Sequence, residues 1–153
     1  MFSSGSPGQT WSANDEERSL ALLARLIFGE IDATANAEQK RAMLVAIGAR
    51  LAGFIRVDDT TDLERLGQQA NALWDKLKWG SAGFEMHDTG IDIIHRGLPL
   101  ESADQLENWP ELLPPILEGA YGRWFGQLND GNDRLRTYVL SVRSGEVEIR
   151  HGL

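Results

Sequence analysis

Residues 112–128 read LLPPILEGAYGRWFGQL, and this stretch decides the fold that we expect. Its apolar spacing is helical, although the three glycines each cost a helix about 1 kcal/mol relative to alanine. At ~100° per residue, bulky and small side chains gather on opposite sides of the helix. The bulky side holds Leu113, Leu117, Tyr121, Trp124 and Leu128, and the small side holds Pro115, Gly119, Gly122 and Gly126.

A glycine side lets another backbone approach closely, and two interpretations of it stay open. In the first, the bulky side meets the chain's own sheet and the glycine side meets another helix of the same chain. In the second, one side is a subunit interface, where aromatic and arginine side chains serve as anchors. The interface residues would then be Gly119, Tyr121, Gly122, Arg123 and Trp124.

Capping signals predict three helices before this stretch. Asn14-x-x-Glu17, Asn36-x-x-Gln39 and Thr61-x-x-Glu64 have the capping-box spacing, and the helices are expected over about residues 14–32, 36–56 and 61–78. In the first helix a stripe of Leu20, Leu23, Ile27 and Ile31 is widened by Leu22, Leu26 and Phe28. An apolar surface of that width predicts burial on two sides.

Two hairpins complete the pattern. The first is expected to turn at Thr89-Gly90, which would pair Met86 with Ile93 and His87 with Asp92. The second is expected to turn at Ser144-Gly145 and pairs apolar with apolar and opposite charges with each other. Its predicted partners are Val142 with Val147, Leu140 with Ile149, and Arg143 with Glu146.

The chain is therefore expected to be an α+β protein, with about four helices and a small antiparallel sheet of two hairpins. Residues 1–13 are rich in Ser and Gly and are expected to form a flexible N-terminal arm. Residues 14–153 would then make a single α+β domain.

Composition excludes several functional classes. The 153 residues carry a net charge of −8, which disfavours nucleic acid and anionic membrane surfaces as partners. Cysteine is absent, so disulfides and thiolate chemistry are excluded. The N-terminus lacks a secretory signal pattern and no apolar run is long enough to span a bilayer. We therefore expect a cytoplasmic protein without a membrane span.

Catalytic motifs are missing as well. The three histidines, His87, His95 and His151, have no zinc-ligand spacing, and no phosphate-binding loop or nucleophile elbow occurs. We expect no metal, no cofactor, no catalytic residue and no enzyme activity. Two alternatives stay open: a small-molecule-binding or sensory α+β domain with a pocket between sheet and helices, and a carbohydrate-active enzyme with two carboxylates.

The block Leu117-Glu118-Gly119-x-Tyr121-Gly122-Arg123-Trp124 resembles the family of protein D encoded with bacterial cellulose synthase. Weaker similarity lies in GEID (29–32), NALWDKLKWG (71–80) and the IIHRGLP segment that ends at Pro99. The blocks span roughly residues 25 to 128, in the order and spacing of that family. The arm and the last hairpin lie outside the resemblance.

The resemblance implies a non-catalytic accessory protein that forms a homo-octameric ring, a tetramer of dimers. It implies that the ring guides extruded β-1,4-glucan chains, promotes cellulose crystallisation and meets other cellulose synthase components. It places the protein in the cytoplasm near the inner-membrane synthase, with the periplasm as the other compartment. Family members contact glucan through N-terminal segments, and the corresponding residues here would be Ser3, Ser4, Gln9, Thr10 and Trp11.

Overall fold

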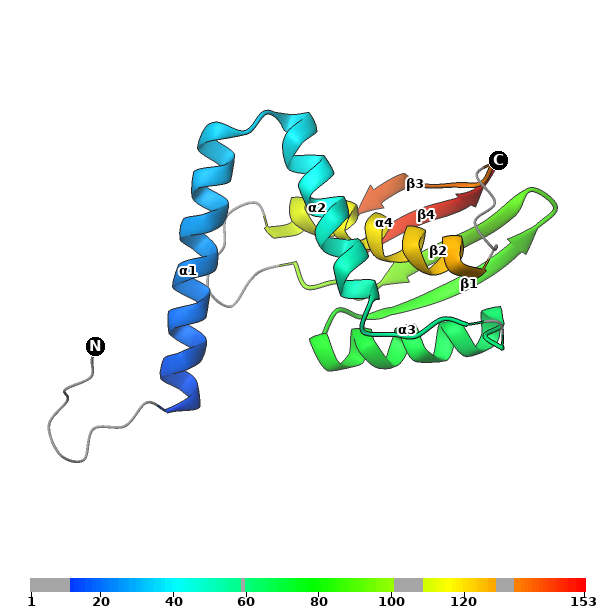
Figure 1. The fold of residues 1–153 in the computed structure, drawn as a ribbon, viewed down its shortest axis with the longest axis horizontal. Helices are drawn as coiled ribbons and strands as arrows, with labels where there is room; N and C mark the ends of the chain where they lie inside the picture. Colours follow the sequence, from blue (N-terminus) through cyan, green and yellow to red (C-terminus); the bar gives the residue numbers. More distant parts are fainter. Residues whose placement is uncertain (1–11, 59, 101–108, 129–133) are drawn as a thin grey trace, which may run out of the picture.

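The computed structural model describes residues 12–58, 60–100, 109–128 and 134–153. They form an α+β fold, as expected, with four helices and one four-stranded antiparallel sheet (Figure 1). In chain order the elements are α1 (Ala13–Thr34), α2 (Ala37–Ala52), α3 (Leu63–Leu77), β1 (Ser81–His87), β2 (Gly90–Arg96), α4 (Trp109–Leu128), β3 (Arg136–Arg143) and β4 (Glu146–Gly152). The two hairpins join through β2 and β4, which gives the strand order β1-β2-β4-β3.

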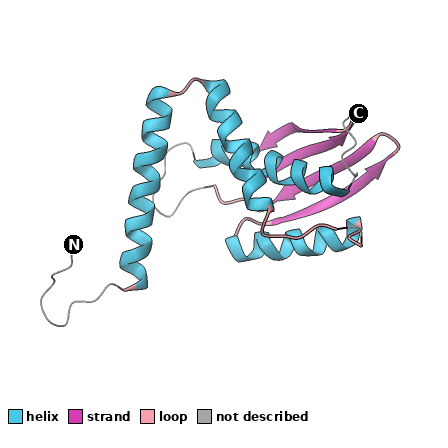
Figure 2. Ribbon diagram, in the orientation of Figure 1, coloured by secondary structure: helices cyan, strands magenta, loops and turns pink. Residues whose placement is uncertain are grey.

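The core lies between the sheet and the two helices α3 and α4 (Figure 2). Leu117 and Phe125 of α4 and Trp74 of α3 are fully buried, together with Ile93 and Ile149 of the two central strands. On β4, Ile149 alternates with the polar residues Glu148 and Arg150, as expected for a sheet whose described helices cover one face. Because α4 lies at the centre of this core, the glycine-bearing stretch does decide the fold.

All three of the first helices begin with a polar N-cap residue, as predicted, but two of the caps lie at positions other than the predicted ones. The capping box of α2 is the expected Asn36–Gln39 pair. In α1 the box is formed by Ser12 and Asp15, two residues before the expected Asn14, and in α3 the N-cap is Asp62 rather than Thr61. Each observed cap has an oxygen that accepts from the backbone N–H three residues later, and neighbouring polar residues compete for that position.

The register of the first hairpin differs from the prediction by two residues. The turn is Asp88-Thr89, so His87 pairs with Gly90 and Met86 with Ile91. Gly90 is needed inside the strand, because a Cβ there would lie 2.2 Å from the backbone oxygen of His151 on β4. The close approach of β4 therefore fixes the turn, and that approach is not visible within the hairpin's own sequence.

The second hairpin is as predicted near its turn and differs farther from it. Arg143 pairs with Glu146 and Val142 with Val147, as expected. Ile149 pairs with Val139 rather than Leu140, because the register shifts between Val139 and Ser141. A bulge of one extra residue leaves Leu140 without the predicted partner.

Two glycines set the distance between α2 and α4. A Cβ on Gly48 of α2 would lie 1.8 Å from the backbone oxygen of Ile116, and a Cβ on Gly119 of α4 would lie 1.9 Å from that of Val45. No side chain fits at either position, so the two backbones are in contact. For Gly119, the structure thus shows the first interpretation, a neighbouring helix of the same chain.

Helix α1 differs from the other helices in its burial. It stands apart from the layers formed by the remaining elements (Figure 1), and none of its residues is buried. The predicted burial of this helix on two sides is not provided by the described part of the chain. Its apolar surface is instead open, because no other described element of the same chain packs over it.

Candidate functional site

The residues predicted to form a subunit interface divide into buried and exposed members. Gly119, Tyr121 and Trp124 are buried within the chain, Gly122 is half-buried and Arg123 is exposed. Trp124 donates its indole N–H to the backbone oxygen of Ala52 at the end of α2. Arg123 donates to the backbone oxygen of Ala49 on the same helix. The contact of this group with a second copy stays a prediction.

Tyr121 lies at the centre of a buried polar network. Its hydroxyl accepts from the indole N–H of Trp74 at 3.0 Å and contacts Nδ1 of His95 at 2.7 Å. Nε2 of His95 lies 2.6 Å from the backbone oxygen of Trp79. A carbonyl can only accept, so Nε2 carries the proton and Nδ1 accepts from the tyrosine hydroxyl. Every polar atom of these side chains is thereby satisfied in a neutral state.

Burial has a clear electrostatic effect on this network. It lowers the pKa of His95 below the ordinary histidine value, which keeps the imidazole neutral. It also raises the pKa of the Tyr121 hydroxyl well above the ordinary value. These hydrogen bonds join α3, α4 and β2 through Trp74, Tyr121 and His95.

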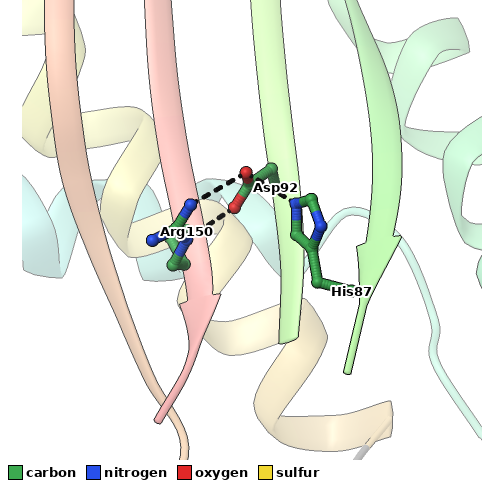
Figure 3. Close-up of polar contacts among 3 residues, drawn as sticks. All are labelled: His87, Asp92 and Arg150. Carbon is green, nitrogen blue, oxygen red and sulfur yellow. Dashed lines mark hydrogen bonds and ion pairs between the residues drawn. The ribbon is translucent and has the colours of Figure 1, made fainter. Parts of the chain in front are cut away.

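A second polar cluster lies on the sheet face that the helices leave open (Figure 3). Arg150 of β4 donates from Nε to Oδ1 of Asp92 at 2.7 Å and from an Nη to Oδ2 at 3.0 Å. His87 of β1 contacts Oδ2 of the same carboxylate at 2.7 Å. Asp92 and Arg150 are direct cross-strand partners on β2 and β4, so the register places this pair.

The Asp92 carboxylate is held in its ionised form. Its hydrogen bonds from Arg150, and then from His87, lower its pKa to about 2 despite its burial. A carboxylate with that pKa does not exchange protons near neutral pH, which disfavours general acid or base catalysis. The cluster therefore ties three strands together. Sequence reasoning predicted His87 and Asp92 as direct cross-strand partners; they are not partners in the register, although their side chains are in contact. It missed Arg150, because the β2–β4 pairing joins distant parts of the chain.

The second buried carboxylate is engaged elsewhere. Glu118 of α4 accepts from the guanidinium of Arg41 on α2 and, at 3.3 Å, from the backbone N–H of Val139 on β3. It lines two shallow cavities of about 320 and 360 Å³, and Asp92 lines neither of them. The two buried carboxylates, Asp92 and Glu118, therefore do not share either of these cavities.

Helix α1 carries an apolar face that no other described element covers. Leu20 is 59% exposed, Leu23 is 53% exposed and Leu26 is 63% exposed. Leu22 and Ile27 are exposed as well, so the apolar side chains form a continuous surface along the helix. Contiguous exposed apolar surface of this kind marks an interaction site. The width of this surface was visible in the sequence, whereas its exposure was not.

The predicted glucan-binding residues, Ser3, Ser4, Gln9, Thr10 and Trp11, lie outside the described residues. Within the described part of the chain, no cluster of three or more His, Asp or Glu side chains could hold a metal ion. No helix among those residues is long and apolar enough to cross a membrane.

Comparison with known proteins gives consistent relatives. The model of the cellulose synthase D-subunit family matches residues 9–152. A cellulose synthase operon protein D from Komagataeibacter xylinus is 29% identical over 108 residues, which cover 68% of this chain and 67% of that protein. A protein of the same name from Komagataeibacter sucrofermentans is 28% identical over equal shares.

A further protein of that name from Komagataeibacter xylinus is 26% identical over 114 residues, covering 72% of this chain and 71% of the relative. Among solved structures, a trafficking protein particle complex subunit 3 from Naegleria fowleri has a TM-score of 0.48 and 13% identity. That likeness covers 90% of this chain and 95% of the other, and carries no argument about function at that score.

Proposed function

Because the chain belongs to the cellulose synthase D-subunit family, we propose that it is a non-catalytic accessory protein of bacterial cellulose synthesis. The match over residues 9–152 is the observation that carries this proposal, because it covers nearly the whole chain. The role proposed is to guide extruded β-1,4-glucan chains and to promote their crystallisation into cellulose. The partners are the glucan chains themselves and other components of the synthase complex.

The proposed active form is a homo-octameric ring, built as a tetramer of dimers. A closed ring of dimers needs at least two different interfaces on each protomer. The exposed apolar face of α1 supports one of them. The exposed Arg123 of α4 is proposed for the other, together with Gly122, whose Cβ position also lies 3.5 Å from Thr137 of the same chain. The buried Gly119, Tyr121 and Trp124 hold that helix in place.

Glucan contact is assigned to the N-terminal arm, through Ser3, Ser4, Gln9, Thr10 and Trp11. These residues offer hydroxyl, amide and aromatic groups, which suit a neutral polysaccharide that must be bound by hydrogen bonds and stacking. The site of action is the cytoplasm next to the inner-membrane synthase. Weak binding between the arm and glucan fits this role better than tight binding, because the contacts must break and form again as the growing glucan chain slides.

Two measurements test the proposal: the molecular mass of the purified protein and the crystalline fraction of the cellulose made with it. Light scattering on the purified protein is expected to give about eight times the chain mass of 17.0 kDa. Gly122→Leu is expected to reduce that mass, because the glycine position is proposed to face a second copy. A monomeric wild type would contradict the ring.

Function is tested in a cellulose-producing bacterium whose own gene for this family has been deleted. The chain is expected to restore the crystalline fraction of secreted cellulose, measured by X-ray diffraction. Replacement of Gln9 and Trp11 by alanine is expected to lower that fraction while the octamer persists. Full restoration by this variant would refute the arm contacts. Turnover of cello-oligosaccharides by the pure protein would refute the non-catalytic role.

A further inference from the structure

A groove lies between the C-terminal end of α2 and helix α3. It has a volume of about 560 Å³, and its walls include Leu51 and Phe54 from one side and Leu73 and Leu77 from the other. Phe54 is 79% exposed, although it is a large apolar side chain at the mouth of an apolar groove. Such a groove suits an amphipathic helix whose apolar residues recur at i, i+3 and i+7.

Polar groups around the groove restrict what can enter it. The charged residues that line it are Arg56 and Lys76, both basic, in a chain whose net charge is −8. The side-chain oxygen of Gln69, which also lines the groove, is buried without a hydrogen-bond partner among the described residues. The two basic side chains therefore favour an occupant that is apolar and acidic at its edges, whereas the Gln69 oxygen is buried and not open to it.

Helix α1 has the matching properties. On a wheel of ~100° per residue, Leu20, Leu23 and Ile27 form one stripe at the i, i+3 and i+7 positions. The charged residues on the side of that stripe are all acidic, namely Glu16, Glu17 and Glu30. The basic residues Arg18 and Arg25 lie on the opposite side of the helix. The apolar stripe of α1 is thus bordered by the charges that complement Arg56 and Lys76.

We propose that the Leu20–Leu23–Ile27 stripe of α1 docks in the α2–α3 groove of a second copy of this chain. The groove of the first copy receives α1 of the second, so that the two contacts are equivalent and the pair closes around a twofold axis. This inference rests on the proposed function, in that it assigns the contact within each dimer of the ring. It accounts for two features at once: the bare face of α1 and the exposed Phe54.

The absence of cysteine makes this contact testable by disulfide cross-linking without background. Leu23→Cys lies in the α1 stripe, and Ala72→Cys is chosen because Ala72 is an exposed residue of the groove. The two substitutions are made on separate, co-expressed copies. After mild oxidation we expect a covalent dimer that joins residue 23 of one copy to residue 72 of the other. Mass spectrometry would identify it, after trypsin, as peptide 19–25 linked to peptide 66–76. Docking raises the effective concentration of the two thiols, so its yield is expected to exceed the control yield about tenfold.

Two matched controls use positions outside the contact. Arg25→Cys replaces Leu23→Cys on the opposite side of α1, and Glu85→Cys replaces Ala72→Cys on the sheet face away from the helices. Either control combined with the remaining partner variant is expected to give the background yield. A yield equal to that of Leu23→Cys with Ala72→Cys would overturn the proposed geometry.

Other outcomes also decide the matter. Efficient cross-linking of Leu23→Cys to itself would overturn the inference in favour of α1–α1 pairing. A disulfide within one chain that carries both cysteines would overturn it in favour of α1 closing on its own groove. An octamer without the 23–72 cross-link would overturn this inference and leave the proposed ring intact. A wild-type monomer in light scattering would overturn the ring and this contact together.

Discussion

Helices α4 and α1 are both rich in large apolar residues, yet the chain treats them in opposite ways. In α4, Leu117, Tyr121, Trp124 and Phe125 are all fully buried. In α1 no residue is buried, and five large apolar side chains are exposed. The two helices differ in burial because they differ in the elements that pack against them. Helix α4 has the sheet on one side and the glycine contact with α2 on the other, whereas α1 has no described element of its own chain over its apolar face.

This contrast separates folding from assembly. Burial of α4 stabilises the single chain, at about 25 cal/mol for each Å² of apolar surface removed from water. Burial of α1 would contribute only when another molecule covers it, which makes that part of the stability dependent on protein concentration. Substitutions in the two helices should therefore differ in what they change.

The largest effect is expected at the α2–α4 contact. Gly119→Ala places a methyl group 1.9 Å from the backbone oxygen of Val45, so one helix must move. We expect a loss of about 3 kcal/mol or more in the free energy of unfolding, measured by urea denaturation. Gly126→Ala is the matched control, because no described atom outside the backbone of its own helix lies within 4 Å of its Cβ position. It should stabilise the helix by up to about 1 kcal/mol, and equal losses for both variants would contradict the contact.

A smaller effect is expected inside the buried network. Tyr121→Phe removes the hydroxyl that serves Trp74 and His95 and leaves their nitrogens without a partner. The free energy of unfolding should fall by about 1–3 kcal/mol. Tyr138→Phe on the edge strand β3 is the comparison: its hydroxyl bonds to Arg150 in a half-buried position, so its loss should cost about 1 kcal/mol or less. An equal loss of unfolding free energy for Tyr138→Phe and Tyr121→Phe would contradict a larger contribution from the buried network.

Acid should weaken the same region. The pKa of His95 is lowered by burial, so near pH 6 the unfolded chain binds a proton that the folded chain does not. The free energy of unfolding therefore keeps its full value above the ordinary histidine pKa of 6.5 and falls as the pH drops below that pKa. The slope is at most about 1.4 kcal/mol per pH unit for each such histidine. Urea denaturation between about pH 7.5 and 5.5 checks this, and a constant free energy across that range would contradict it.

The smallest effect on the single chain is expected in α1. Leu20→Ser replaces a side chain that is already 59% exposed, so unfolding of the dissociated chain should change by less than about 0.5 kcal/mol. Its effect should appear in the mass by light scattering, which is expected to fall. Arg25→Ser on the opposite side of α1 should change neither quantity. A large loss of single-chain stability for Leu20→Ser would remove the contrast between α1 and α4.

Much of the local structure could be predicted because it depends on near neighbours. The Asn36–Gln39 capping box and the pairs next to the Ser144-Gly145 turn were predicted correctly. The position of Gly90 and the bulge near Leu140 were not. Both depend on where a distant strand lies, and several registers satisfy a short hairpin sequence equally well.

The candidate surfaces divide in the same way. Sequence periodicity identified the apolar stripe of α1 and the two sides of α4, since helical spacing places residues on a face whatever the rest of the chain does. Tertiary structure alone decided that Gly119 meets Val45, that Arg150 joins His87 and Asp92, and that a basic-rimmed groove lies between α2 and α3. The physical reason is that periodicity records which side chains need a partner, whereas the partner is chosen by contacts between segments far apart in the chain.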